Sequence, residues 1–245
     1  MTRALGRLLV VETRLFLRDR TAVLLTLALP TLVLCALGTV PALRRPEELL
    51  GDRSLVAHLA PSLLAMSVAT TGLTTLPNTL VGYREAGVPR RLATTPVPAA
   101  ALLAAQLLVN LAVLASSALL LITVGRLAFG VPLPGNLPWF AVALVLGSSA
   151  TYALGLLVAA VARSVRMSHA LTIPALLLTV LLGSGHVPRF LLPDALVRIV
   201  DHTPPGVRAL LDSWSGAVPQ PGQLVVMVAV TVGAGTVAAG LFRWK

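Results

Sequence analysis

Residues 82–98 read GYREAGVPRRLATTPVP and place a short charged segment between two long apolar stretches. Arg84, Glu85, Arg90 and Arg91 fall within eight residues, and prolines stand at positions 89, 96 and 98. Proline interrupts a continuous helix because it lacks an amide hydrogen and its ring clashes with the preceding turn. A segment too polar for lipid, between segments too apolar for water, lies at a membrane surface. It is either a turn whose arginines fix orientation or a loop that docks another protein.

The composition around this segment identifies a polytopic membrane protein. Only 11% of the 245 residues are charged and 56% are apolar, whereas soluble domains carry roughly 25% charged residues. Six apolar runs are each long enough to cross a hydrocarbon core about 30 Å thick. They do not alternate as barrel strands do, so we expect an all-α fold, with one transmembrane domain over residues 1–245. The predicted spans are residues 21–41, 56–81, 99–125, 137–162, 167–185 and 224–242.

The N-terminal residues 2–20 are predicted to form an amphipathic helix in the membrane interface. At about 100° per residue, Arg3, Arg7, Arg14 and Arg18 share one face, which suits the anionic headgroups. Glu12 instead projects from the middle of the apolar face, where a carboxylate needs a partner or water. A specific ion pair and a side chain that reaches solvent are both open interpretations.

The long segment 186–222 is expected on the outer side, between the fifth and sixth spans. Its apolar residues recur at helical spacing between prolines, which indicates a short re-entrant helical segment in the outer leaflet. Backbone at that depth must be covered by protein or line a wet cavity. A surface loop with a short amphipathic helix is the alternative.

The charge distribution predicts that both termini and residues 82–98 are cytoplasmic. With the N-terminus inside, the inner segments carry 12 basic and three acidic residues, for a net charge of +9. The outer segments carry seven arginines and six acids, for a net charge of +1, and the two sides account for the total of +10. Cytoplasmic loops carry such an excess of Lys and Arg. The basic charge is therefore a topology signal, and nucleic acid is not an expected partner.

Polar side chains gather within the second and third spans. Those that recur on one face are candidates for lining a transport pathway, with interhelical hydrogen bonding as the alternative role. The candidates are Ser67, Thr71, Thr74, Asn78, Gln106 and Asn110. In the fourth span a stripe of small residues at i, i+4 spacing predicts close packing against another helix. Its members are Gly147, Thr151, Gly155 and Ala159.

Several function classes lack the residues they need. No ionisable side chain stands in the middle of a span, as a proton- or ion-coupled pump usually requires. The four histidines have no metal-ligand spacing. The sequence LGSGH at residues 182–186 invites comparison with an intramembrane serine protease, but the last span has no histidine to serve as a base. The single lysine, Lys245, excludes a G-x-x-x-x-G-K-[ST] phosphate loop, so any ATP is bound by another polypeptide.

Taken in order, several landmarks resemble the membrane subunits of bacterial ATP-binding-cassette exporters of type 2, the drug-efflux and polysaccharide-export class. The first is ETRLFLRDR at residues 12–20, with Pro30 in the span that follows. The second, and most recognisable, is REAGVPRRLATTPVP at residues 84–98. SGHVP at residues 184–188, later prolines at 193 and 204, and a last span that ends in FRW complete the set. The resemblance covers nearly the whole chain.

The resemblance implies that residues 82–98 carry a coupling helix that meets a separate cassette ATPase, beside the N-terminal helix. Glu12 would then pair with Arg84, Arg90 or Arg91, or with an arginine of the ATPase. The implied docking residues are Glu12, Arg84, Glu85, Arg90, Arg91 and Leu92.

The resemblance also implies a complex of two six-span permease subunits, identical or related, with two ATPase subunits that bind ATP and Mg²⁺. The expected location is the bacterial cytoplasmic membrane. The expected function is export of a drug-like or lipid-linked substrate, with no catalytic, cofactor or metal site in this chain. A membrane enzyme and a non-transporting anchor or assembly factor are the alternatives.

Overall fold

The computed structural model describes residues 2–47, 53–92, 94, 98–179 and 206–241. Within these ranges, five helices are long and apolar enough to cross a membrane. The prediction of an all-helical polytopic membrane protein is confirmed to this extent. The candidate spans are Arg20–Gly38, Leu55–Glu85, Ala100–Phe129, Leu137–Val161 and Pro221–Leu241.

The described elements follow one another along the chain in a simple order. The N-terminal helix α1 (Thr2–Arg18) precedes a first span made of α2 (Arg20–Val23), the π-helical turn η1 (Leu24–Ala28) and α3 (Leu29–Gly38). The 3₁₀ turn η2 (Pro41–Arg44) and an antiparallel pair of two-residue strands, β1 (Pro46–Glu47) and β2 (Arg53–Ser54), come next. The remaining elements are α4 (Leu55–Ala69), the π-helical turn η4 (Thr70–Thr75), α5 (Leu76–Glu85), α6 (Val88–Leu92), α7 (Ala99–Phe129), α8 (Leu137–Val161), α9 (Val165–Leu178), α11 (Val207–Trp214) and α12 (Pro221–Leu241).

Two spans contain a wide π-helical turn just ahead of a proline. The turn η1 is followed by Pro30, and η4 is followed by Pro77. A proline ring clashes with the carbonyl four residues earlier. A π turn widens the helix at that point and so accommodates the ring without ending the helix. The second span therefore continues without a break from Leu55 to Glu85. It extends four residues beyond the predicted end, so that Gly82–Glu85 are helical and not part of a loop.

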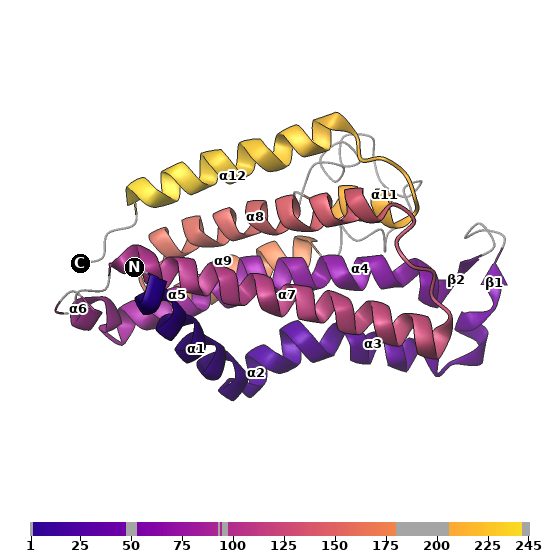
Figure 1. Ribbon diagram of the computed structural model, residues 1–245, viewed down its shortest axis with the longest axis horizontal. Helices are drawn as coiled ribbons and strands as arrows, with labels where there is room; N and C mark the ends of the chain where they lie inside the picture. Colours follow the sequence, from indigo (N-terminus) through magenta and orange to yellow (C-terminus); the bar gives the residue numbers. More distant parts are fainter. Residues whose placement is uncertain (1, 48–52, 93, 95–97, 180–205, 242–245) are drawn as a thin grey trace.

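The long helices lie side by side and define two ends of the bundle (Figure 1). The start of α1, the helix α6 and the C-terminal end of α12 lie at one end, which we call the α6 end. The strands β1 and β2 and the helix α11 lie at the other, which we call the α11 end. Segments far apart in sequence, the start of α1 and the end of α12, thus lie at the same end of the bundle.

The second span is the centre of the bundle and the most buried of the candidate spans. Leu64 and Leu76 of this span are fully buried against neighbouring helices. The helix α12 packs along α8 and is the most exposed span, with apolar side chains such as Val225 and Val232 on its open face. A helix with exposed apolar residues over its length is suited to lipid.

The predicted fifth span and outer segment are described only in part. The helix α9 covers 14 residues, Val165–Leu178, and the predicted span continues to residue 185, outside the described residues. Of the predicted outer segment 186–222, residues 186–205 also lie outside them. The described remainder contains α11, which packs on α8 and α4.

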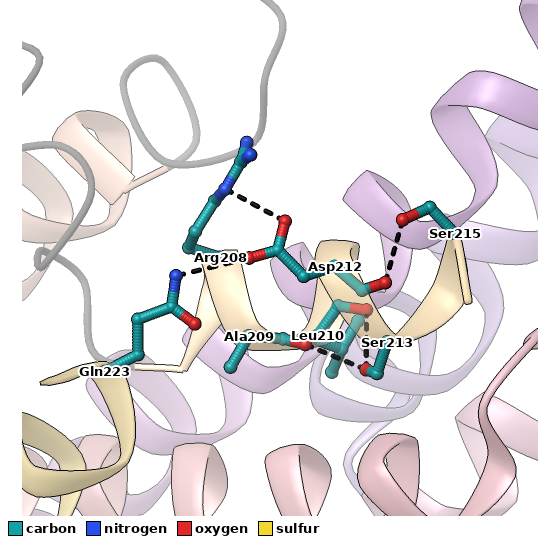
Figure 2. Close-up of polar contacts among 7 residues, drawn as sticks. All are labelled: Arg208, Ala209, Leu210, Asp212, Ser213, Ser215 and Gln223. Carbon is teal, nitrogen blue, oxygen red and sulfur yellow. Dashed lines mark hydrogen bonds and ion pairs between the residues drawn. The ribbon is translucent and has the colours of Figure 1, made fainter. Parts of the chain in front are cut away.

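The helix α11 is held by polar contacts, several of which involve Asp212 (Figure 2). Arg208 Nε lies 3.0 Å from Asp212 Oδ1, one helical turn away, and Gln223 Nε2 donates to Asp212 Oδ2 at 3.2 Å. At its C-terminus, the amides of Gly135 and Asn136 donate to the carbonyls of Trp214 and Ser213, each at 3.1 Å. These contacts tie α11 to the loop before α8 and to the start of α12.

Candidate functional site

The side chain of Glu12 lies buried between α1 and the second and third spans. It is only 5% exposed, although α1 exposes most of its other side chains. Tyr83 Oη donates a hydrogen bond to Glu12 Oε2 at 2.6 Å, and Gln106 Nε2 donates to the same oxygen at 2.5 Å. Three elements, α1, α5 and α7, are therefore joined through one carboxylate oxygen. We call Glu12, Tyr83 and Gln106 the Glu12 cluster.

Burial raises the pKa of the Glu12 carboxyl above its ordinary value, because the ionised form loses its hydration. The hydrogen bonds from Tyr83 and Gln106 favour the ionised form and oppose part of this rise. The two donors are neutral, so they compensate the buried charge less than a cation would.

The ion pair predicted between Glu12 and an arginine of this chain is wrong for the described structure. Arg84 points away from Glu12: its guanidinium Nη1 donates to the carbonyl of Ala159 at 3.2 Å, and its Nη2 donates to that of Ala162. Arg90 and Arg91 lie in α6 and are exposed. One oxygen of the short Glu12 side chain accepts instead from donors that α5 and α7 bring within reach. Pairing with an arginine of another polypeptide stays a prediction.

A cavity of about 330 Å³ opens beside the Glu12 cluster. Its wall combines carboxylates, amides, hydroxyls and aromatic rings, and none of the described lining residues is Lys or Arg. The lining residues are Glu12, Leu15, Phe16, Asp19, Ala22, Thr75, Thr79, Gly82, Tyr83, Gln106, Val109 and Asn110. Asp19 also accepts a hydrogen bond from the amide of Ala22 at 3.0 Å and so caps the first span.

Arg84 and Glu85 hold the turn between α8 and α9. Arg84 bonds to the last carbonyls of α8, and Glu85 Oε1 accepts from the amide of Val165, the first residue of α9, at 3.1 Å. A cation at the C-terminus of one helix and an anion at the N-terminus of the next both match the helix dipoles. We call this arrangement the 84–85 clamp. It connects the end of the second span to two further helices.

The remaining predicted docking residues lie in the short helix α6. Gly87 precedes it with a φ of +70°, a left-handed conformation that glycine adopts readily. Pro89 is buried and anchors α6, while Arg90 and Arg91 are exposed and Leu92 is half-buried. The arginines of residues 82–98 therefore differ in their surroundings. Arg84 binds carbonyls of this chain, whereas Arg90 and Arg91 are exposed at the α6 end.

The six candidate pathway residues lie at separate places. Gln106 and Asn110 line the cavity beside Glu12. Ser67 Oγ lies 3.3 Å from Ser117 Oγ of α7, and Thr71 bonds back to its own helix. The hydroxyl of Thr74 is buried without a partner among the described residues. Asn78 contacts α9, where Ser168 Oγ donates to its Oδ1 at 2.5 Å and His169 Nδ1 lies 3.2 Å from its Nδ2.

The small-residue stripe of α8 lies against two neighbouring backbones. A methyl group at Gly155 would overlap the carbonyl oxygen of Gly72 in η4, and one at Gly147 would lie 3.1 Å from the Cα of Gly206. Thr151 is 1% exposed and contacts Gly72, and Ala159 is likewise 1% exposed. The wide turn η4 thus packs directly onto α8 at glycine.

Two functional residues were missed by the sequence analysis. Tyr83 stands inside the quoted stretch, next to Arg84, and a phenol at the boundary of a span is a signal for a hydrogen bond at the interface. Asp19 has the form of a helix N-cap before Arg20. The Tyr83 signal does not identify the carboxylate of Glu12 as the partner, since that contact depends on how α1 packs against α7.

Comparisons with known proteins agree with this architecture. No curated protein matches the chain. The family model described as ABC-2 type transporter matches residues 3–204, a range that runs from α1 past α9 and includes the Glu12 cluster, the 84–85 clamp and α6.

Proposed function

Because the chain belongs to the ABC-2 type transporter family, we propose that it is the permease subunit of an ATP-driven exporter in a bacterial cytoplasmic membrane. Permease domains of this family generally pair with a cassette ATPase. The observation that carries the proposal is the family match over residues 3–204, which takes in the charged stretch at the α6 end. ATP and Mg²⁺ would be bound by the ATPase, and two permease subunits, identical or related, would form the membrane part.

In this proposal the α6 end faces the cytoplasm and docks the ATPase. Two observations support it. Arg90 and Arg91 are exposed there, and the basic residues of the sequence gather in the segments that connect at this end, in keeping with the positive-inside rule. Arginine suits a docking surface because its planar guanidinium can bind carboxylates with two parallel hydrogen bonds.

A sixth crossing of the membrane is part of the proposal. The chain is at the α6 end at Val165, where Glu85 binds its amide, and it is at the α11 end at Val207, the first residue of α11. We propose that the sixth crossing lies between these residues and begins with α9. With the five long helices this gives an even number of crossings and both termini on the cytoplasmic side.

The clamp and the cluster would transmit the motion of the ATPase. Force on α6 reaches α5 through the two-residue connection at Ala86 and Gly87. From there the 84–85 clamp connects it to α8 and α9, and the Glu12 cluster connects it to α1 and α7. A displacement of α6 would thus reach four other helices. Rigid-body rocking of such groups is how other transporters alternate access.

Affinity purification of the tagged chain from its native membranes tests the proposal. We expect a cassette ATPase to copurify, and we expect its ATP hydrolysis to rise in the complex relative to the free ATPase. A chain that purifies alone, or with partners that lack a nucleotide-binding cassette, would contradict the proposal and favour an anchor or assembly role. The cargo is proposed to be a drug-like or lipid-linked molecule.

A further inference from the structure

The cavity beside the Glu12 cluster has the chemistry of a binding site for a positively charged amine. Its wall holds two carboxylates, Glu12 and Asp19, and no Lys or Arg among the described residues. Both described donors to Glu12, Tyr83 and Gln106, use Oε2. No donor to Oε1 occurs among the described residues, so one oxygen of a carboxylate that lines the cavity is available to accept a hydrogen bond.

A second acceptor in the same wall also lacks a donor. Asn110 is 4% exposed and lines the cavity. Its amide nitrogen donates to the carbonyl of Gln106 at 2.9 Å, while its Oδ1 is buried without a partner in the described structure. A buried acceptor without a donor is costly, and such groups in native structures call for an explanation. The wall therefore has acceptors in excess of donors.

The rest of the wall suits an apolar body attached to the charge. Leu15, Phe16, Ala22 and Val109 contribute apolar surface, and the rings of Phe16 and Tyr83 can face a cation. The volume of about 330 Å³ lies at the small end of the range for small-molecule sites, roughly 300–1,000 Å³. The cavity lies beside α1, whose exposed Val10, Val11 and Leu17 suit the membrane interface, where amphipathic amines concentrate.

We propose that this cavity binds a small amphipathic primary amine, whose ammonium group donates hydrogen bonds to Glu12 and whose hydrocarbon part lies against Phe16 and Val109. A primary ammonium has three N–H donors and no acceptor, which complements a wall with free acceptors. The bound cation gives Glu12 the charged partner that the described part of the chain does not provide. The proposal concerns binding to this chain and does not require the ATPase or export.

Calorimetric titration of the purified chain in phosphatidylcholine nanodiscs tests the proposal, with octylammonium as the probe and empty nanodiscs to measure partitioning into lipid. We expect saturable binding at one site per chain. Octyltrimethylammonium has the same charge and chain but no N–H donor, and 1-octanol has no charge. Both are expected to bind at least about tenfold more weakly, since hydrogen bonds to charged groups are worth a factor of about ten or more.

Two variants test the place of binding by different means. Glu12→Gln removes the charge but keeps an acceptor oxygen for Tyr83 and Gln106, and it should weaken octylammonium binding at least about tenfold. Ala22→Phe fills the cavity and should abolish binding without touching a carboxylate. Asp212→Asn, an acid at the α11 end, is the matched control and should bind as the wild type does.

Three results would overturn the proposal. The first is heat no greater than that of empty nanodiscs. The second is binding that persists in both Glu12→Gln and Ala22→Phe. The third is equal affinity for octylammonium and octyltrimethylammonium, which would show that no N–H donation to the wall takes place. None of these results bears on whether a cassette ATPase copurifies, so a failure here is distinct from a failure of the proposed function.

Discussion

Replacing Gly155 with alanine tests the packing of the second span on the fourth. A methyl group at position 155 would overlap the carbonyl oxygen of Gly72 and lie 3.3 Å from Pro77 Cδ. Both neighbours are rigid, because one is backbone and the other is a proline ring. The overlap can be relieved only if α8 moves away from η4. Such a movement also strains Thr151, which contacts Gly72 one turn earlier.

The expected cost follows from two opposing effects. Overpacking a well-packed interior costs about 1–3 kcal/mol. Alanine in place of glycine in a helix contributes up to about 1 kcal/mol in the opposite direction. Gly235→Ala in α12 is the matched control, because nothing lies within 4 Å of a methyl group there. The two variants share the helix-propensity effect, so the difference between them isolates the overpacking cost of about 1–3 kcal/mol.

Equilibrium unfolding of the purified chains in mixed micelles of SDS and a mild detergent measures this difference. We expect Gly155→Ala to unfold at a lower SDS fraction than Gly235→Ala, and we expect the bulkier Gly155→Leu to reduce the folded yield. If Gly155→Ala and Gly235→Ala have the same free energy of unfolding, α8 does not pack on η4 at Gly155. An unchanged yield for Gly155→Leu would mean that this face of α8 is open to lipid.

Three further predictions concern the α6 end. Burial raises the pKa of Glu12 in the folded state, so the free energy of unfolding of the wild type should fall as pH rises from the ordinary pKa of 4.5 to the raised one. Unfolding midpoints measured at pH 4–8 should therefore show Glu12→Gln gaining stability relative to the wild type as pH rises. A difference in stability that does not change with pH would contradict a raised pKa. Arg84→Ala removes the hydrogen bonds to α8, so it should lower the free energy of unfolding by about 1–3 kcal/mol and lower the ATP hydrolysis stimulated by the complex. Arg91 is exposed, so Arg91→Ala should lower ATPase binding with little change in the free energy of unfolding. The opposite pattern would refute an internal role for Arg84 and a docking role for Arg91. In a Cys35→Ser chain, a cysteine that replaces Ala86 should react with an impermeant maleimide only after the membrane is opened. Labelling in intact cells would show that the true topology is the inverse of the predicted one.

The sequence predicts the helical architecture well because the physical cause is local. A run of twenty apolar residues must be helical in lipid whatever its neighbours are, so the candidate spans agree with α7, α8 and α12 to within a few residues. Glycines at i, i+4 spacing likewise predict close packing from the sequence alone.

The contacts of the site depend on tertiary structure and could not be predicted in the same way. Glu12 was recognised as a carboxylate that needs a partner, but its partners are Tyr83 and Gln106 and not the nearby arginines. An arginine at the end of a span can donate hydrogen bonds either to a carboxylate or to the free carbonyls at the end of a neighbouring helix. The turn after α8 lies within reach of Arg84, and nothing in the sequence near residue 84 indicates this.

The central claim, that the α6 end docks a cassette ATPase, is tested most directly by photo-crosslinking in native membranes. A photoreactive phenylalanine derivative replaces the exposed Arg90 of α6 in one variant and the exposed Val218, in the segment between α11 and α12, in the other. The account predicts that position 90 crosslinks to a protein that carries a nucleotide-binding cassette, identified by mass spectrometry, and that position 218 does not. A crosslink to such a protein from position 218, or none from position 90 in membranes where the ATPase is present, would contradict it.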